Sequence, residues 1–134
     1  MPLLPILLPC GQLYIVSPKH RKTHATEDAS VWIVDSNTEM SCFNEAFTSN
    51  WTEDGFVWGL ISEGLNQLVV LGKNYQNYGL RIAKFRSDAA NWHGYPADNN
   101  NRPQDRPRPV ILDAWSQNGL ISKSLRSRIQ GGRL

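Results

Sequence analysis

Long apolar runs are absent from this sequence, and their absence limits the classes of protein it can belong to. A membrane-spanning helix needs about 20 consecutive, mainly apolar residues. Polar residues, charged residues or prolines interrupt every apolar stretch of this chain well before that length. The sequence therefore predicts no membrane-spanning helix and no membrane partner.

Short motifs that identify common enzyme classes are also missing. The sequence contains no GxGxxG, no glycine-rich loop ending in Lys-Ser or Lys-Thr, no GxSxG and no HExxH. These absences count against nucleotide-cofactor enzymes and the common hydrolases, and we expect no cofactor.

Cysteine is scarce, with Cys10 and Cys42 far apart in the chain and neither in a CxxC pair. We expect two reduced, buried thiols, with a disulfide between them as the alternative. The run that ends at Cys10 superficially resembles an export leader, but it has no basic start and is broken by Pro2, Pro5 and Pro9. A cytoplasmic location is therefore predicted.

The composition that remains is sufficient for one hydrophobic core. The chain has 134 residues, 40% of them hydrophobic and 19% charged, which is typical of one globular domain. The predicted fold is a single α+β domain over residues 1–134, with a mixed, mostly antiparallel sheet of four to five strands, one packed helix and a C-terminal helical pair.

Local patterns predict the order of elements. Residues 56–61 could be strand or short helix. The other expected elements are an extended apolar arm at 1–11, strands at 12–16, 30–35, 65–71 and 80–85, a helix from Thr38 or Ser41 to about Asn50 capped by Ser or Thr, a long polar loop at 91–109, and a basic helical hairpin at 110–131.

Charge is unevenly distributed along the chain. Residues 1–101 hold seven Lys and Arg against ten Asp and Glu, a net of −3, whereas residues 102–134 hold seven against two, a net of +5. Clustered cations can neutralise phosphates of a nucleic acid, and a solvated or protein-docking face is the alternative. The candidate nucleic-acid contacts are Lys123, Arg126, Arg128 and Arg133 in the hairpin, Arg106 and Arg108 before it, and Trp92 and Tyr95 as base-stacking aromatics.

His93 is the candidate acid or base for catalysis. It lies between Trp92 and Tyr95 and follows a predicted strand that carries Lys84 and Arg86. Metal-independent RNA cleavage needs a group that titrates near neutral pH and cations for the phosphate, which these residues can supply. The alternative is that the aromatics pin a long loop to the sheet while His93 bonds a backbone carbonyl.

His20 and His24 are spaced four residues apart, as two metal ligands on one helix face would be. The segment follows Pro18 and is predicted as a loop, so no metal site is expected there. We expect a basic loop, either plainly solvated or adding to a phosphate-binding surface.

Three functional hypotheses follow, each on a different segment. The first is a small nucleic-acid-interacting protein that uses the basic C-terminal helical module. The second is a protein-partner or self-association module, such as an inhibitor or assembly subunit, that uses the proline-rich apolar arm. The third is a metal-independent ribonuclease with His93 as general acid or base.

Overall fold

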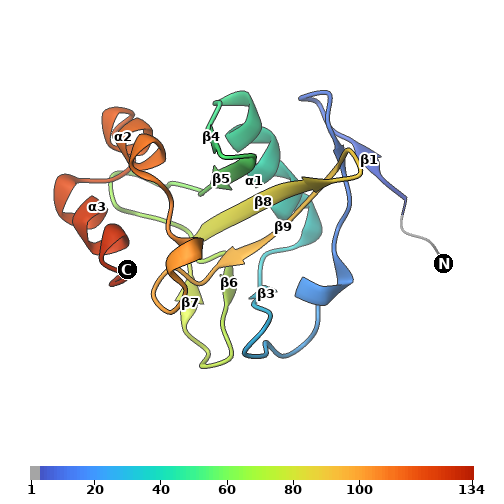
Figure 1. Cartoon of the computed structure of the whole chain (residues 1–134), viewed down its shortest axis with the longest axis horizontal. Coiled ribbons are helices and arrows are strands. Elements are labelled where there is room, and N and C mark those ends of the chain that lie inside the picture. Colours follow the sequence, from blue (N-terminus) through green and yellow to red (C-terminus); the bar gives the residue numbers. More distant parts are fainter. Residues whose placement is uncertain (1–3) are drawn as a thin grey trace.

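Two sheets and three α-helices make up the part of the chain that the computed structural model describes, residues 4–134 (Figure 1). The larger sheet has six strands in the order β1-β2-β9-β8-β5-β4, and the smaller has three in the order β3-β6-β7. The fold belongs to the predicted α+β class. The six-stranded sheet contains β1 (Ile6–Leu7), β2 (Leu13–Tyr14), β4 (Thr52–Glu53), β5 (Phe56–Gly59), β8 (Ile82–Asp88) and β9 (Asn91–Ala97), and the smaller sheet contains β3 (Val31–Trp32), β6 (Gly72–Lys73) and β7 (Gly79–Leu80).

Strands β8 and β9 form the longest hairpin, which crosses the centre of the view in Figure 1. Ala89 and Ala90 connect them and both have positive φ, 50° and 67°, as a two-residue hairpin turn of type I′ requires. Residues 91–97 are thus a strand, and the prediction of a loop from residue 91 to 109 is wrong for this part. The irregular connection begins only after Ala97.

Gly94 and Pro96 made the β9 sequence resemble a loop, and each has a structural reason. A Cβ on Gly94 would lie 2.2 Å from Cδ1 of Phe85, so only glycine permits this ring to cross the strand. Pro96 lacks an N–H, but β2 pairs with β9 only at Asn91 and Trp92, which leaves the outer side of β9 unpaired at residue 96.

Helix α1 (Ser36–Thr48) covers one face of the large sheet and lies behind its strands in Figure 1. It begins earlier than predicted, because Asp35, and not a Ser or Thr, accepts the N-cap hydrogen bond from the amide of Thr38 at 2.7 Å. Its Phe43 ring lies 5.2 Å from that of Phe85 on β8. Lys84 and Arg86, the neighbours of Phe85 along β8, therefore face the other side of the sheet. The β5 residues opposite them, Trp58 and Phe56, face that side too.

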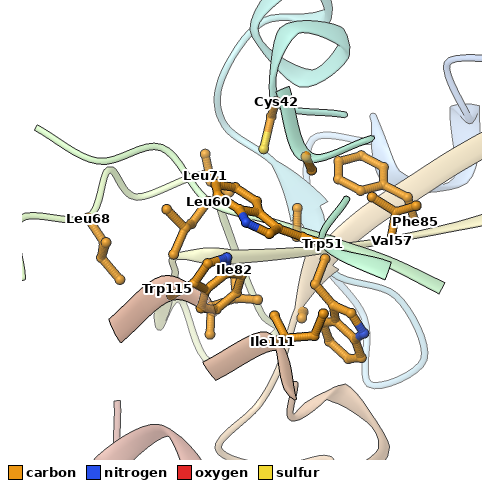
Figure 2. Packing of buried hydrophobic residues seen from close by; sticks show 14 of the residues in the cluster. Cys42, Trp51, Val57, Leu60, Leu68, Leu71, Ile82, Phe85, Ile111 and Trp115 are labelled. Carbon is orange, nitrogen blue, oxygen red and sulfur yellow. The ribbon is translucent and has the colours of Figure 1, made fainter. Parts of the chain in front are cut away.

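The predicted C-terminal helical pair is confirmed as α2 (Pro109–Gln117) and α3 (Lys123–Gln130). Ser122 caps α3 through the amide of Leu125, at 3.1 Å. The buried Trp115 of α2 packs edge-on against Trp51, with ring centroids 5.9 Å apart, in the core shown in Figure 2. The helical pair thus closes the β4 end of the sheet.

The predicted strand at 65–71 is absent. Asn66 has a positive φ of 62° and its side chain bonds Ser122, accepting from its amide at 2.7 Å and donating to its hydroxyl at 3.0 Å. These contacts tie Asn66 to the start of α3, and the residues after it make only isolated ladder contacts: Leu68 bridges Ser62, and the Leu71 amide donates to the Leu80 carbonyl at 2.7 Å. Residues 72–80 form a short hairpin of β6 and β7. Residues 56–59, which could have been strand or helix, are strand β5. The predicted strand at 80–85 is divided between β7 and β8.

Both cysteines are free thiols, as predicted, although Cys10 is only half-buried. Burial raises the pKa of the Cys42 thiol to about 12. The first three residues of the predicted arm lie outside the described residues; Ile6 and Leu7 form exposed edge strand β1. Within residues 4–134 no helix is long and apolar enough to cross a membrane.

Candidate functional site

A cavity of about 320 Å³ opens on the sheet face opposite α1. Its walls are strands β5, β8 and β9, the 3-10 helix η1 (Pro18–His20), the loop that follows η1, and the connection after β9 with its 3-10 helix η2 (Pro103–Asp105). The lining residues with charged side chains, aromatic side chains facing the cavity or acid–base chemistry are Lys19, His20, Glu27, Asp28, Phe56, Lys84, Arg86, His93, Tyr95, Asp98, Arg102 and Asp105.

Strand register brings the three candidate catalytic residues together. Arg86 on β8 is directly opposite His93 on β9, and Lys84 is directly opposite Tyr95. Directly opposed residues of an antiparallel pair have Cβ atoms about 4.5–5.5 Å apart on the same face. His93, Arg86 and Lys84 therefore share one wall of the cavity.

Arg86 is the cation of this wall that remains available for a ligand. Its side chain is exposed, and none of the ion pairs formed within residues 4–134 includes it. Lys84 is different, because its ammonium is buried and donates to the Gln104 carbonyl at 2.7 Å. It also lies 4.3 Å from the Phe56 ring centroid, and its burial lowers its pKa.

A buried carboxylate, Asp105, organises the floor of the cavity. It accepts a hydrogen bond from the Tyr95 hydroxyl at 2.8 Å and one from the Asp98 amide at 3.0 Å, and lies 3.8 Å from the Lys84 ammonium. Burial and Asp105 together raise the pKa of Tyr95, so its hydroxyl stays protonated at neutral pH. These contacts hold the side chains of Lys84 on β8 and Tyr95 on β9 in place.

His20 completes the cavity, although its sequence context predicts a loop residue with no part in the site. Its ring stacks on Tyr95 with centroids 5.2 Å apart, its Nδ1 lies 2.8 Å from the Ser30 carbonyl oxygen, and it is only 9% exposed. The expected solvated basic loop is correct for the exposed His24 but wrong for His20. Pro18, which starts η1, was the one local signal of order in this segment.

Both histidines are neutral at pH 7 in the free protein. Burial is the main cause that lowers the pKa of His93, and the positive charge of Arg86 lowers it further, while Asp88 opposes this. Burial likewise lowers the pKa of His20, with Lys19, His93 and Arg86 adding to the effect and the Ser30 carbonyl opposing it. A bound anion would reverse part of this shift in both rings.

The candidate nucleic-acid cations in and around the C-terminal helical pair do not line the cavity, and several have partners within the chain. Arg126 forms an ion pair with Asp113, and Arg108 lies 3.3 Å from Asp54. Arg106 donates to the Asn99 carbonyl at 2.8 Å. The remaining members, Lys123, Arg128 and Arg133, are exposed, and Arg128 donates to the Arg133 carbonyl at 3.3 Å.

Trp92 and Tyr95 do not form one stacking platform. Trp92 faces α1, where its ring lies 5.3 Å from that of Phe43, and its Nε1 donates to Gln12 at 3.1 Å. Tyr95 faces the cavity because it is an odd number of residues away on the same strand. Of the two predicted aromatics, only Tyr95 belongs to this site.

Within residues 4–134 no group of three or more His, Cys, Asp or Glu side chains is arranged to hold a metal ion. The chemistry that the cavity itself offers is proton transfer by two histidines beside an unpaired guanidinium. Comparisons of this chain with models of protein families, with curated proteins and with solved structures found no match.

Proposed function

We propose that this protein is a metal-independent ribonuclease whose reaction takes place in the cavity between β8, β9 and η1. The observation that carries the proposal is the pairing of Arg86 with His93 across β8 and β9, on a cavity wall. His93 transfers a proton and Arg86 binds the phosphate.

The chemistry of RNA matches these groups. The 2′-hydroxyl of a ribonucleotide attacks the adjacent phosphorus, and the 5′-oxygen of the next nucleotide leaves. This reaction needs one group to take a proton, one to give a proton, and a positive charge for the phosphate oxygens. Guanidinium groups are well suited to the last task, because they bind phosphate with two parallel hydrogen bonds.

The size and position of the cavity also support this function. Its volume of about 320 Å³ is within the range of small-ligand sites. A cavity of this size accommodates one nucleotide of a strand. The rigid sheet holds the catalytic side chains, whereas the surrounding loops, with Arg102 on one of them, form its rim.

The two other hypotheses stay predictions on other surfaces. Arg126 in the basic helical module and Arg108 just before it form ion pairs, and Arg106 donates to a backbone carbonyl, which leaves fewer free charges for phosphates than the sequence suggests. The apolar arm does present exposed side chains, including Leu4 and Leu7, at the edge of the large sheet. Neither surface gathers acid–base chemistry as the cavity does.

The direct test uses DNA oligonucleotides that each contain one internal ribonucleotide, with A, C, G or U at that position. The proposal predicts cleavage at the ribonucleotide in at least one of them, in the presence of EDTA, with a 2′,3′-cyclic phosphate on the upstream product. The matched control carries a 2′-O-methyl group and stays intact. Cleavage of none of the four, or activity that EDTA abolishes, contradicts the proposal.

A further inference from the structure

The His20 ring is fixed in one orientation by contacts on two sides. Its Nδ1 meets the Ser30 carbonyl oxygen at 2.8 Å, and its face stacks on Tyr95 at an interplanar angle of 22°. Tyr95 is itself held by the hydrogen bond from its hydroxyl to Asp105. A ring held in this way loses little conformational entropy when a substrate binds.

The Ser30 contact also determines which nitrogen carries the proton. A carbonyl oxygen only accepts, so Nδ1 must be the donor and the neutral ring must keep its lone pair on Nε2. None of the hydrogen bonds between described residues uses Nε2 of His20, and the residue lines the cavity. The free form of His20 therefore keeps an unused proton acceptor, Nε2, on a residue that lines the cavity.

The residue next to His20 anchors this segment to the core. Arg21 donates to the Val34 carbonyl at 2.5 Å and to the carboxylate of the buried Glu39 at 2.6 Å. Glu39 lies on α1, which packs on the far side of the sheet. The residue that follows η1 is thereby tied to α1 and to the segment before it.

His93 differs from His20 in its surroundings. It is more accessible, and it lies opposite Arg86, where the phosphate would bind. Burial and the charge of Arg86 lower the pKa of His93 in the free protein, and Asp88, two residues beyond Arg86 on β8, opposes them. A phosphate bound at Arg86 adds negative charge beside His93 and so favours its protonated form. The other charged groups that line the cavity are Lys19, Glu27, Asp28, Lys84, Asp98, Arg102 and Asp105.

We infer that His20 is the general base of the proposed reaction and His93 its general acid, an assignment that depends on the proposed ribonuclease function. Nε2 of His20 takes the proton of the 2′-hydroxyl as the 2′-oxygen forms a bond to phosphorus. The bond between phosphorus and the 5′-oxygen breaks, and protonated His93 gives its proton to that oxygen. The products are a 2′,3′-cyclic phosphate and a 5′-hydroxyl, and both histidines then exchange protons with water.

The test compares two substrates that differ only in the need for an acid. One is a dinucleotide whose first nucleotide is the ribonucleotide at which the wild-type protein cleaves best. The other is the 3′-(4-nitrophenyl) phosphate of the same nucleoside. Nitrophenolate leaves as an anion, so it needs no proton, whereas attack of the 2′-hydroxyl still needs a base. The variants are His20→Gln and His93→Ala, and the matched control is His24→Gln in the same segment.

We expect His20→Gln to lose about 10²–10⁴-fold in rate on both substrates. His93→Ala should lose a similar factor on the dinucleotide but stay within about tenfold of wild type on the nitrophenyl ester. His24→Gln should match wild type on both. Circular dichroism and thermal unfolding of each variant separate loss of a base from loss of the fold.

The outcomes distinguish the inference from the proposed function. If wild type cleaves the dinucleotide but His20→Gln is unaffected, or regains its rate on the nitrophenyl ester, the assignment of His20 is wrong and the ribonuclease proposal stands. If wild type cleaves neither substrate, both are wrong. Should His20→Gln fail to fold, nitrogen NMR of wild type at pH 7 decides: protonated Nε2 in the free protein overturns the assignment, and an Nδ1–H tautomer supports it.

Discussion

Replacing His93 with alanine is expected to lower the rate of RNA cleavage by about 10²–10⁴-fold while the protein stays folded. The loss follows from removal of the proposed proton donor beside Arg86, the proposed phosphate-binding residue. Stability should change by no more than about 0.5 kcal/mol, because the ring is only half-buried and no hydrogen bond between described residues includes it. Steady-state cleavage of a fluorogenic RNA and thermal unfolding measure the two effects.

The control for this prediction is His24→Ala, which removes an exposed histidine in the loop beyond η1. We expect it to keep wild-type activity and stability. An active His93→Ala variant with an unchanged melting temperature contradicts the role of His93. Equal loss of activity in His24→Ala would indicate a general effect of histidine removal instead of chemistry in the cavity.

The largest expected effect on stability is that of Arg21→Ala. Arg21 forms an ion pair with the fully buried Glu39, which also accepts a hydrogen bond from the Tyr14 hydroxyl. Removing one partner of a buried pair leaves an uncompensated charge and costs about 3–5 kcal/mol. Chemical denaturation at neutral pH should show a loss of this size in the free energy of unfolding.

This loss should depend on pH in a defined direction. Burial raises the pKa of Glu39, and the hydrogen bonds from Tyr14 and Arg21 oppose that rise. Without Arg21 the pKa of Glu39 in the folded protein rises further above its unfolded value. The folded state then binds the proton more readily, so the variant loses stability as the pH increases from the unfolded pKa to the folded pKa.

The cost of Arg21→Ala should therefore be greater at pH 7 than at pH 4. The double variant Arg21→Ala/Glu39→Gln removes the buried charge altogether and should be more stable than Arg21→Ala alone at pH 7. A cost below about 1 kcal/mol, or one that is equal at the two pH values, contradicts the account of Glu39 as a buried carboxylate that depends on Arg21.

Elements whose signals are local could be predicted from the sequence. The helical pair at the C-terminus begins at Pro109 and at the Ser122 cap, and Gly119 has the positive φ that ends a helix. Each signal acts within one or two turns of helix, so no knowledge of the remaining fold is needed. Helix α1 was also recognised, although Asp35 proved to be its cap.

Strand β9 could not be predicted in this way, because its tolerance of Gly94 and Pro96 depends on distant residues. Phe85 occupies the space above Gly94, and the missing N–H of Pro96 is on a side where no strand pairs. The Ala89-Ala90 turn gave no signal either, since alanine is uncommon at positive φ. Because the β8–β9 hairpin was not predicted, neither was the pairing of His93 with Arg86 across it.

The candidate site could be predicted only in part, again because some of its contacts join residues that are distant in the sequence. His93, Lys84 and Arg86 were recognised from residue type and proximity in the chain, and strand register places them on one wall. His20 was overlooked because its two contacts, with Ser30 and Tyr95, join it to residues remote in the sequence. Histidine within a basic stretch carries no signal of burial by itself.

Binding of RNA in the cavity can be followed residue by residue with NMR. A short RNA with 2′-O-methyl groups, which the proposed reaction cannot cleave, is titrated into uniformly labelled protein. We expect the resonances of Arg86, His93 and Tyr95 to shift together and to saturate at one affinity. Shifts confined to the basic helical module at 110–131, or no shifts at a millimolar concentration of RNA, would contradict binding in the cavity.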